Sequence, residues 1–407
     1  MLTFVRALRY RPYALLWSGQ TISILGDKIF QVALAWWVLQ KTGSAIAMGT
    51  VYTLTTIPML AFILFGGVLV DRLPRIRMMM LSDYIRGIII LLAAILAYLN
   101  VLEIWHVYIF SLVLGTVDAF FYPAFNAVMP DMIPNEDLNS ANSLNTLARQ
   151  LAGVVGPALG ATVMSLGGAP LSFGLDAFSF FIAVLCLLPI QHMAINEAQK
   201  TERIAPKAVI HDLGEGLKVV KESTWLWLTI LIAGLTNMAY AAPMEVGLPF
   251  LIKNHLHADV NVLGYFYSAS SIGAVLSAIL VGRIKHLRRR GLALYSVWTL
   301  IGLFIVAMGL PIGIPGVLLM AMLAGFGSTT LGLIWTNTLQ QRVPRQLLGR
   351  VTSVDYLGSY ILLPVGYSLG GIVTDSFGPA IAFMGGGALM TILVATGFMS
   401  KQVRELD

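Results

Sequence analysis

Ionisable side chains within long apolar stretches are the residues of this sequence that could carry chemistry. Asp27 lies about 14 residues into an apolar stretch, and three- and four-residue steps place it on one helix face with Gln20, Ser23 and Gln31. Near the centre of a membrane helix a charge costs roughly 2.5–3.5 kcal/mol on insertion scales. We therefore expect Asp27 to face a wet cavity and to bind a proton or a substrate. The alternative is an interhelical contact that only stabilises the fold.

Four further ionisable groups within apolar stretches need partners or roles. Lys28 points about 100° away from Asp27, so it needs an acid on another helix, and we favour Asp118 over Asp176 as its ion-pair partner. Glu245 lies between two prolines, which loosen the backbone hydrogen bonding around it. We predict that Asp118 and Glu245 contribute to proton coupling or to the substrate cavity, or else that they stabilise helix packing.

A loop rich in arginine follows the second apolar stretch. Gly67 is followed by Asp71 and Arg72, and then by Arg75 and Arg77. At a helix end, a carboxylate can face the positive N-terminus of another helix while an arginine pairs with a second acid. The pattern predicts a contact between helices at this end of the molecule, and the alternative is a solvated basic loop.

The elements that position these residues are membrane-spanning helices. Hydrophobic residues make up 57% of the 407, charged residues only 11%, and the mean hydropathy is +0.80. About 20 apolar residues in a helix cross the hydrocarbon of a bilayer. We predict twelve spans, at residues 13–39, 45–69, 78–99, 105–125, 138–166, 171–190, 225–252, 263–282, 292–310, 315–337, 348–374 and 380–399.

Lysine and arginine cluster in alternate loops, which orients the predicted helices. The loops on one side carry Arg6, Arg9, Arg11, Arg72, Arg75, Arg77, Lys200, Arg203, Lys207, Lys218, Lys221, Arg283, Lys285, Arg288, Arg289, Arg290, Arg342, Arg345, Arg350, Lys401 and Arg404. The opposite loops offer only Lys41 and Lys253. By the positive-inside rule, both termini are expected in the cytoplasm. The net charge of +6 follows from this asymmetry, and we expect no nucleic-acid partner.

The chain is predicted to consist of two halves, residues 1–190 and 225–407. They are joined by a polar linker, residues 191–224, in which residues 209–221 form an amphipathic helix along the membrane surface. The halves repeat at an offset of 210 residues, which aligns Gly156 with Gly366 and Gly160 with Gly370. In the fifth span Gly156, Pro157 and Gly160 are expected to form a close helix contact.

The loop from Gly67 to Arg77 resembles the G-x-x-x-D-R-x-G-R-(R/K) signature of the major facilitator superfamily, with proline at position 74 and isoleucine at position 76 as departures. The resemblance extends over the full chain. Segments typical of the drug-efflux branch, which includes macrolide exporters and the enterobactin exporter, lie at residues 16–20 with 26–27, 42–44, 82–86, 130–131 with 141–143, and 156–160.

The resemblance implies an all-α integral membrane protein with twelve transmembrane helices in two pseudo-symmetric six-helix halves. It further implies that Asp71 meets the helix beginning near Leu348 and that Arg75 pairs with Asp131. Together these contacts would latch the cytoplasmic side in the outward-open state. Four further charged residues, which we place nearer the cytoplasmic ends, are expected to belong to the same structural latch: Asp83, Arg86, Arg149 and Asp355. A monomer in the bacterial cytoplasmic (inner) membrane is the expected form.

Missing motifs narrow the function. The sequence contains no G-x-x-x-x-G-K-(S/T) and no H-E-x-x-H, and its single cysteine is Cys186. We therefore expect no cofactor, no metal site and no enzymatic activity. The energy source is expected to be an ion gradient or the substrate's own gradient. The leading hypothesis is a proton-coupled exporter of amphipathic small molecules that works by alternating access. The alternatives are a siderophore exporter or lysophospholipid transporter on the same fold, and a non-transporting receptor.

Overall fold

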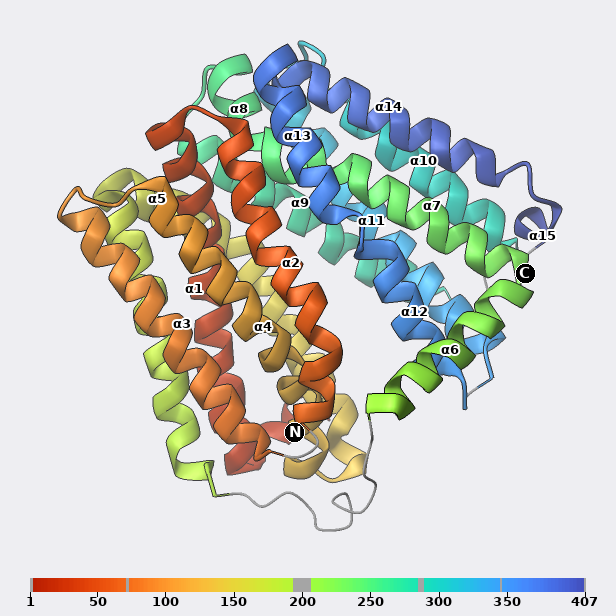
Figure 1. Cartoon of the computed structure of the whole chain (residues 1–407), viewed down its shortest axis with the longest axis horizontal. Coiled ribbons are helices and arrows are strands. Elements are labelled where there is room, and N and C mark those ends of the chain that lie inside the picture. Colours follow the sequence, from red (N-terminus) through yellow and green to blue (C-terminus); the bar gives the residue numbers. More distant parts are fainter. Residues whose placement is uncertain (1–2, 71–72, 193–205, 285–288, 345, 406–407) are drawn as a thin grey trace. The chain divides into compact units, whose positions relative to one another are not determined.

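The computed structural model describes residues 3–70, 73–192, 206–284, 289–344 and 346–405, and these residues form helices joined by short turns (Figure 1). The helices are α1 Arg11–Thr42, α2 Ala45–Val70, α3 Arg75–Tyr98, α4 Ile104–Met132, α5 Leu138–Leu187, α6 Pro206–Glu222, α7 Thr224–Ala241, α8 Leu248–Phe250, α9 Val260–Val281, α10 Arg290–Met308, α11 Gly313–Arg342, α12 Leu348–Tyr360, α13 Leu363–Phe377, α14 Pro379–Gly397 and α15 Lys401–Arg404. Short 3-10 turns at Thr3–Arg9, Asn135–Asp137 and Leu188–Ile190 connect them.

The number of spans agrees with the prediction. Among the described residues, eleven helical stretches are long and apolar enough to cross a membrane, and the longest runs over 56 residues from Asn135 to Ile190. That stretch bends at Gly168, whose φ of 64° and ψ of −165° are not helical. Glycine adopts a positive φ without the steric penalty of a side chain. The bend divides the stretch into two spans, so the described residues contain twelve, the number predicted.

Two spans are less regular than the hydropathy pattern suggests. The seventh contains π-helical segments at Ala242–Gly247 and Leu251–His255, beside Pro243 and Pro249. The eleventh is interrupted at residues 361–362, just before Pro364, and is therefore formed by α12 and α13. Proline has no N–H to donate, so the backbone around it adopts wider or broken turns.

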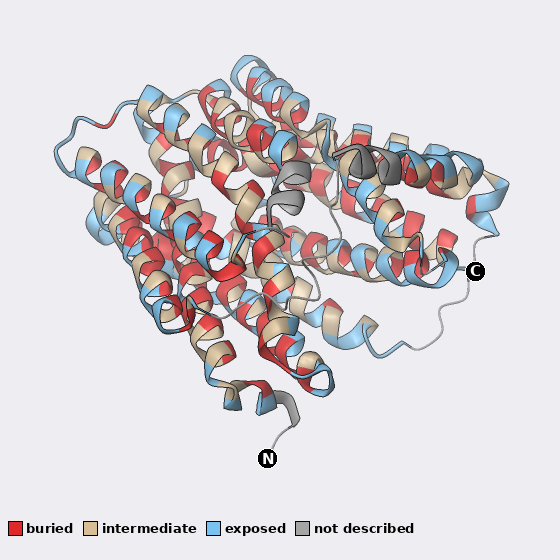
Figure 2. Cartoon of the chain, turned by 60° about the horizontal axis from the view of Figure 1, so that its bottom comes forward, coloured by how far each residue is buried: buried red, intermediate tan, exposed pale blue. Residues whose placement is uncertain are grey.

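Helix α3 shows how one span divides between a lipid-facing and a protein-facing side. Its exposed apolar residues recur every three or four positions: Leu81, Tyr84, Ile88, Leu92 and Ile95. Its opposite face buries Asp83, Arg86 and Ile90. The same division into exposed and buried strips is visible along the other long helices (Figure 2). Large exposed apolar strips are expected where lipid covers the protein.

The chain forms two compact units. Unit 1 comprises Met1–Thr42 and Leu54–Ala205, and unit 2 comprises Gly43–Thr53 and Pro206–Asp407. The boundaries of the units differ from those of the predicted halves in two places. The linker helix α6 groups with unit 2, where a Cβ on Gly216 would lie 2.7 Å from the carbonyl oxygen of Arg350. The first turns of α2 also group with unit 2, because they pack against α13.

Glycines that align at the offset of 210 residues make equivalent contacts in the two units. In unit 1, a Cβ on Gly160 would lie 2.9 Å from Cα of Ile29 in α1. In unit 2, a Cβ on Gly370 would lie 2.5 Å from Cα of Ala242, at the end of α7. The fifth span thus touches the first, as the eleventh touches the seventh, which supports the internal duplication.

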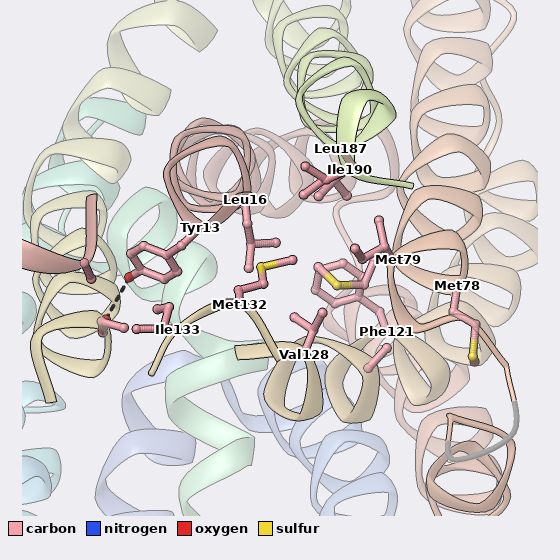
Figure 3. Close-up of a cluster of buried hydrophobic side chains, with 14 of the residues drawn as sticks. Tyr13, Leu16, Met78, Met79, Phe121, Val128, Met132, Ile133, Leu187 and Ile190 are labelled. Carbon is pink, nitrogen blue, oxygen red and sulfur yellow. Dashed lines mark hydrogen bonds between the residues drawn. The ribbon is translucent and has the colours of Figure 1, made fainter. Parts of the chain in front are cut away.

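An apolar cluster in unit 1 fixes the helices that carry the polar residues. It joins Tyr13 of α1, Met79 of α3, and Phe121 and Met132 of α4, all of them buried (Figure 3). The hydroxyl of Tyr13 donates a hydrogen bond to the carbonyl oxygen of Ala141 in α5 at 2.9 Å. Apolar packing and this hydrogen bond therefore hold α1, α3, α4 and α5 together independently of any ion pair.

Candidate functional site

Four helices of unit 1 bring together a group of polar side chains that we call the central polar cluster. Its members are Gln20 and Asp27 from α1, Asp83 and Arg86 from α3, Asp118 from α4, and Asp176 from α5.

Arg86 is the hub of this cluster. Its Nη1 lies 3.5 Å from Oδ1 of Asp83, and its Nη2 donates to Oδ1 of Asp118. The guanidinium also lies over the ring of Phe121, 4.1 Å from its centroid. The Arg86 side chain is 7% exposed and that of Asp83 is fully buried. In such surroundings a charge is tolerated only when it is paired and hydrogen-bonded.

Gln20 completes the environment of Asp83. Its Nε2 donates to Oδ2 of Asp83 at 2.9 Å, and Gln20 itself is buried. The predicted face of α1 therefore has two parts. Gln20 and Ser23 are buried against other helices, whereas Asp27, further along, is exposed.

Asp27 and Asp176 add two carboxylates beside the hub. Asp27 lies near the middle of α1 and interacts electrostatically with Arg86, Asp118 and Lys28. Asp176 is buried opposite Gly26, where a Cβ would lie 2.6 Å from its Oδ1. Oδ2 of Asp176 is buried without a hydrogen-bond partner. Two carboxylates thus contact the guanidinium of Arg86, and two more interact with it electrostatically.

The predicted ion pair between Lys28 and Asp118 is wrong. Nζ of Lys28 donates to Oε1 of Gln31 at 3.0 Å, one helical turn further along α1. Asp118 is paired with Arg86 instead. A Cβ on Gly156 would lie 2.5 Å from Cβ of Lys28, so the stem of the lysine packs against the glycine motif of α5. Gln31 therefore belongs with Lys28, although it shares a helical face with Asp27.

Asp83 and Arg86 were also misplaced by sequence reasoning, which assigned them to a latch near the cytoplasmic ends. Arg86 lies at the midpoint of the 24-residue helix α3. The central position of Arg86 in its predicted span could have revealed the cluster from the sequence. An arginine at the centre of a membrane helix needs acids on neighbouring helices. Asp83, one turn earlier, is one of those acids.

Glu245 lies in unit 2 among tyrosines. It belongs to the π-helical segment after α7, and Tyr240 and Tyr267 both interact with it electrostatically. Tyr52, from the first turns of α2, does so too, and its ring stacks on that of Tyr367 with centroids 5.2 Å apart. The structure therefore places Glu245 and Asp27 in different units. Of the predicted cavity residues, Gln20, Asp27 and Asp118 lie in the central polar cluster of unit 1.

The arginine-rich loop is described in part. Nη1 of Arg75 lies 2.7 Å from Oδ2 of Asp131, and this is the ion pair that the resemblance implied. The same nitrogen also donates to the carbonyl oxygen of Ala127. Arg77 is exposed and lies 3.4 Å from Nδ1 of His192. Gly67 lies within α2. Asp71 and Arg72 lie outside the described residues.

A metal site does not emerge from the described ranges, in which no three His, Cys, Asp or Glu side chains are grouped so as to hold an ion. The chemistry that the central polar cluster offers is proton exchange and ion pairing.

Comparison with known proteins places this geometry in a family. The model of a family described as transmembrane secretion effector matches residues 3–407. Macrolide efflux protein A of Streptococcus pyogenes is 23% identical over 401 residues, with 96% of each chain covered. The multidrug efflux pump Tap of Mycolicibacterium fortuitum is 28% identical over 393 residues, with 94% of each chain covered. The enterobactin exporter EntS of Shigella boydii serotype 18 is 28% identical over 389 residues, covering 93% of this chain and 86% of the exporter.

Solved structures agree on the fold. A bacterial homologue of the iron transporter ferroportin, in an inward-facing state, aligns with a TM-score of 0.70 over 95% of this chain and 98% of that one, at 14% sequence identity. Identity at this level shows a shared transporter fold alone.

Proposed function

Because the chain belongs to the transmembrane secretion effector family, in the drug-efflux branch of the major facilitator superfamily, we propose that it exports amphipathic small molecules from the bacterial cytoplasm in exchange for protons. Transport would proceed by alternating access between two six-helix halves. The observation that carries the proton part of this proposal is the central polar cluster, with its four carboxylates around Arg86.

Asp27 is the carboxylate best placed to exchange the proton. Asp83 and Asp118 each contact Arg86 directly, and Asp176 is buried. Asp27 is exposed and still interacts with the arginine. A carboxylate reached by water at one stage of a cycle and enclosed at another changes its affinity for protons between the two. Release of that proton would leave a charge that a substrate or Arg86 could offset.

Glu245 and its tyrosines are the proposed contacts for substrate. Tyrosine rings offer apolar faces and a hydroxyl, and a carboxylate among them suits a molecule that is apolar with one positive or donor group. The names of the related pumps include a macrolide exporter and a multidrug pump, which is consistent with such a substrate. The likeness to an enterobactin exporter keeps a siderophore as the second candidate.

The substrate class can be tested in a bacterial host that lacks its own efflux pumps. We expect the chain to lower the accumulation of macrolides and other amphipathic amines several-fold relative to the empty vector. The Asp27→Asn variant, which should stay folded, should lose most of that difference. Siderophore secretion measured in the same cells decides between the two candidates. If neither class is exported at normal expression, the proposed function is wrong.

The proposed orientation, with both termini in the cytoplasm, makes a separate prediction. Peptide tags at Met1 and Asp407 should be shielded from membrane-impermeant reagents added to whole cells, and should react once the membrane is made permeable. A tag after His257, in the turn between the seventh and eighth spans that is expected outside, is the positive control. Labelling of either terminal tag in intact cells would contradict the orientation.

Asp71 is proposed to latch the cytoplasmic side by facing the N-terminus of α12. Asp71→Asn keeps the size of the side chain and removes its charge, so we expect normal insertion and a resting population shifted about two- to fivefold toward inward-open. Spin labels on Asn135 and Gln341, two exposed positions near the ends of α4 and α11, would report the distance. An unchanged distribution would return Asp71 to a solvated loop charge.

A further inference from the structure

Asp375, near the end of α13, binds the beginning of α2. Its Oδ1 accepts a hydrogen bond from the backbone N–H of Ala45 at 2.6 Å, and its Oδ2 accepts one from Ile46 at 3.1 Å. The hydroxyl of Ser44 donates to the same Oδ2 at 2.7 Å. The first N–H groups of a helix have no partner within it and carry its positive end, so a carboxylate there is favoured by both hydrogen bonding and charge.

Glycines let the backbones of α2 and α13 approach closely near Asp375. A Cβ on Gly371 would lie 2.7 Å from Cα of Ile46, and a Cβ on Gly49 would lie 2.4 Å from the carbonyl oxygen of Tyr367. One turn further along α2, the hydroxyl of Thr53 donates to the carbonyl oxygen of Pro364 at 3.3 Å. The contact runs along the first turns of α2, and Asp375 closes it at the outer end.

The contact lies at the edge of the buried interface. Asp375 and Ile46 are exposed, whereas Ala45 is fully buried. When the carboxylate leaves, water can reach the N–H group of Ile46. Exposed hydrogen bonds contribute little net free energy because water replaces the partner. The bond to Ile46 is of this kind and is suited to opening and closing in each cycle.

The role of Asp375 resembles the one predicted for Asp71. The sequence predicts that Asp71, which follows the second span, meets the start of the eleventh span at Leu348. The acid near the end of the eleventh span, Asp375, meets the start of α2, at Ala45. In the predicted topology the two acids are at opposite ends of the second and eleventh spans.

We propose that Asp375 is a periplasmic latch that holds the beginning of α2 on α13 while the outer side of the transporter is closed, and lets go when that side opens. It is the counterpart, across the membrane, of the latch expected at Asp71. This inference rests on the proposed alternating-access function, but distances between labels report it in the absence of any substrate.

The test measures spin-label distances at the periplasmic ends of the two units. Labels on Val101 and Leu310, which are exposed in the turns after α3 and α10, are introduced after Cys186→Ala removes the native thiol. In Asp375→Asn one carboxylate oxygen becomes an amide nitrogen that cannot accept. The ratio of short to long distances should then fall about fivefold. Asp375→Ala removes all three bonds and should lower that ratio further.

Asp259→Asn is the matched control. Asp259 caps its own helix, α9, by accepting from the N–H of Asn261 at 3.0 Å, and it is exposed at the same side of the predicted topology. This variant should leave the distance distribution as in the wild type. Identical distributions for the wild type and both Asp375 variants would overturn the latch, as would an equal shift in Asp259→Asn. Failure of transport in the unmutated chain would instead count against the proposed function.

Discussion

Arg86→Gln should abolish transport and sharply reduce the yield of folded protein. The substitution leaves Asp83 and Asp118 without their shared cation inside a membrane protein. Removing one partner of a buried ion pair typically costs about 3–5 kcal/mol. The measurement is the fraction of detergent-solubilised protein that elutes as a single folded species, with transport normalised to that fraction.

Two further variants sharpen this prediction. Arg86→Lys keeps the charge, but lysine cannot reach two carboxylates with a planar fork or lie flat over Phe121. We therefore expect partial yield and impaired transport. Arg11→Gln removes an exposed arginine at the start of α1 and should behave as the wild type. Wild-type yield in Arg86→Gln would show that the carboxylates of the cluster do not need the guanidinium.

Composition and periodicity were sufficient to predict the spans, because the requirement to bury the backbone polar groups of a membrane segment leaves the helix as the solution for apolar stretches of this length. The bend at Gly168 falls between two predicted spans, residues 138–166 and 171–190. The break between α12 and α13 falls within one predicted span, residues 348–374, and hydropathy did not register it. It lies just before Pro364, and such a local change depends on a single residue.

The pairing of charges could not be predicted from spacing alone. We predicted a pair between Lys28 and Asp118 because each lies within an apolar span, where a cation and an acid both need a partner of opposite charge. In the structure Asp118 forms an ion pair with Arg86, and Lys28 donates a hydrogen bond to Gln31. Which helices are neighbours, and how each is rotated about its axis, decides such a pairing. Neither property is encoded in the hydropathy of one span.

Asp27→Asn should uncouple proton movement from export while leaving the protein folded. Asp27 is exposed and has no direct contact with Arg86 among the described ion pairs, so its loss should leave the pairs of Arg86 with Asp83 and Asp118 intact. Neutral asparagine mimics the protonated acid. Substrate should still move down its own gradient, and accumulation against a gradient should fall at least tenfold, on the order of the 1.4 kcal/mol that corresponds to that factor.

Asp118→Asn is the necessary comparison. Asp118 contacts Arg86 directly, so this variant leaves the arginine with Asp83 as its direct partner. We expect a loss of folded yield that exceeds any loss of coupling in the protein that does fold. The two aspartates are therefore distinguished by what each variant loses first.

The central claim, that Asp27 carries the exchanged proton, is tested most directly by substrate-induced pH changes in proteoliposomes, normalised to folded protein. Wild-type protein should move protons when substrate is added, and Asp118→Asn should retain a measurable signal per folded molecule. Asp27→Asn should give none, although substrate still equilibrates across the membrane. A wild-type pH change in Asp27→Asn would contradict the account and would make Glu245 the next carboxylate to test.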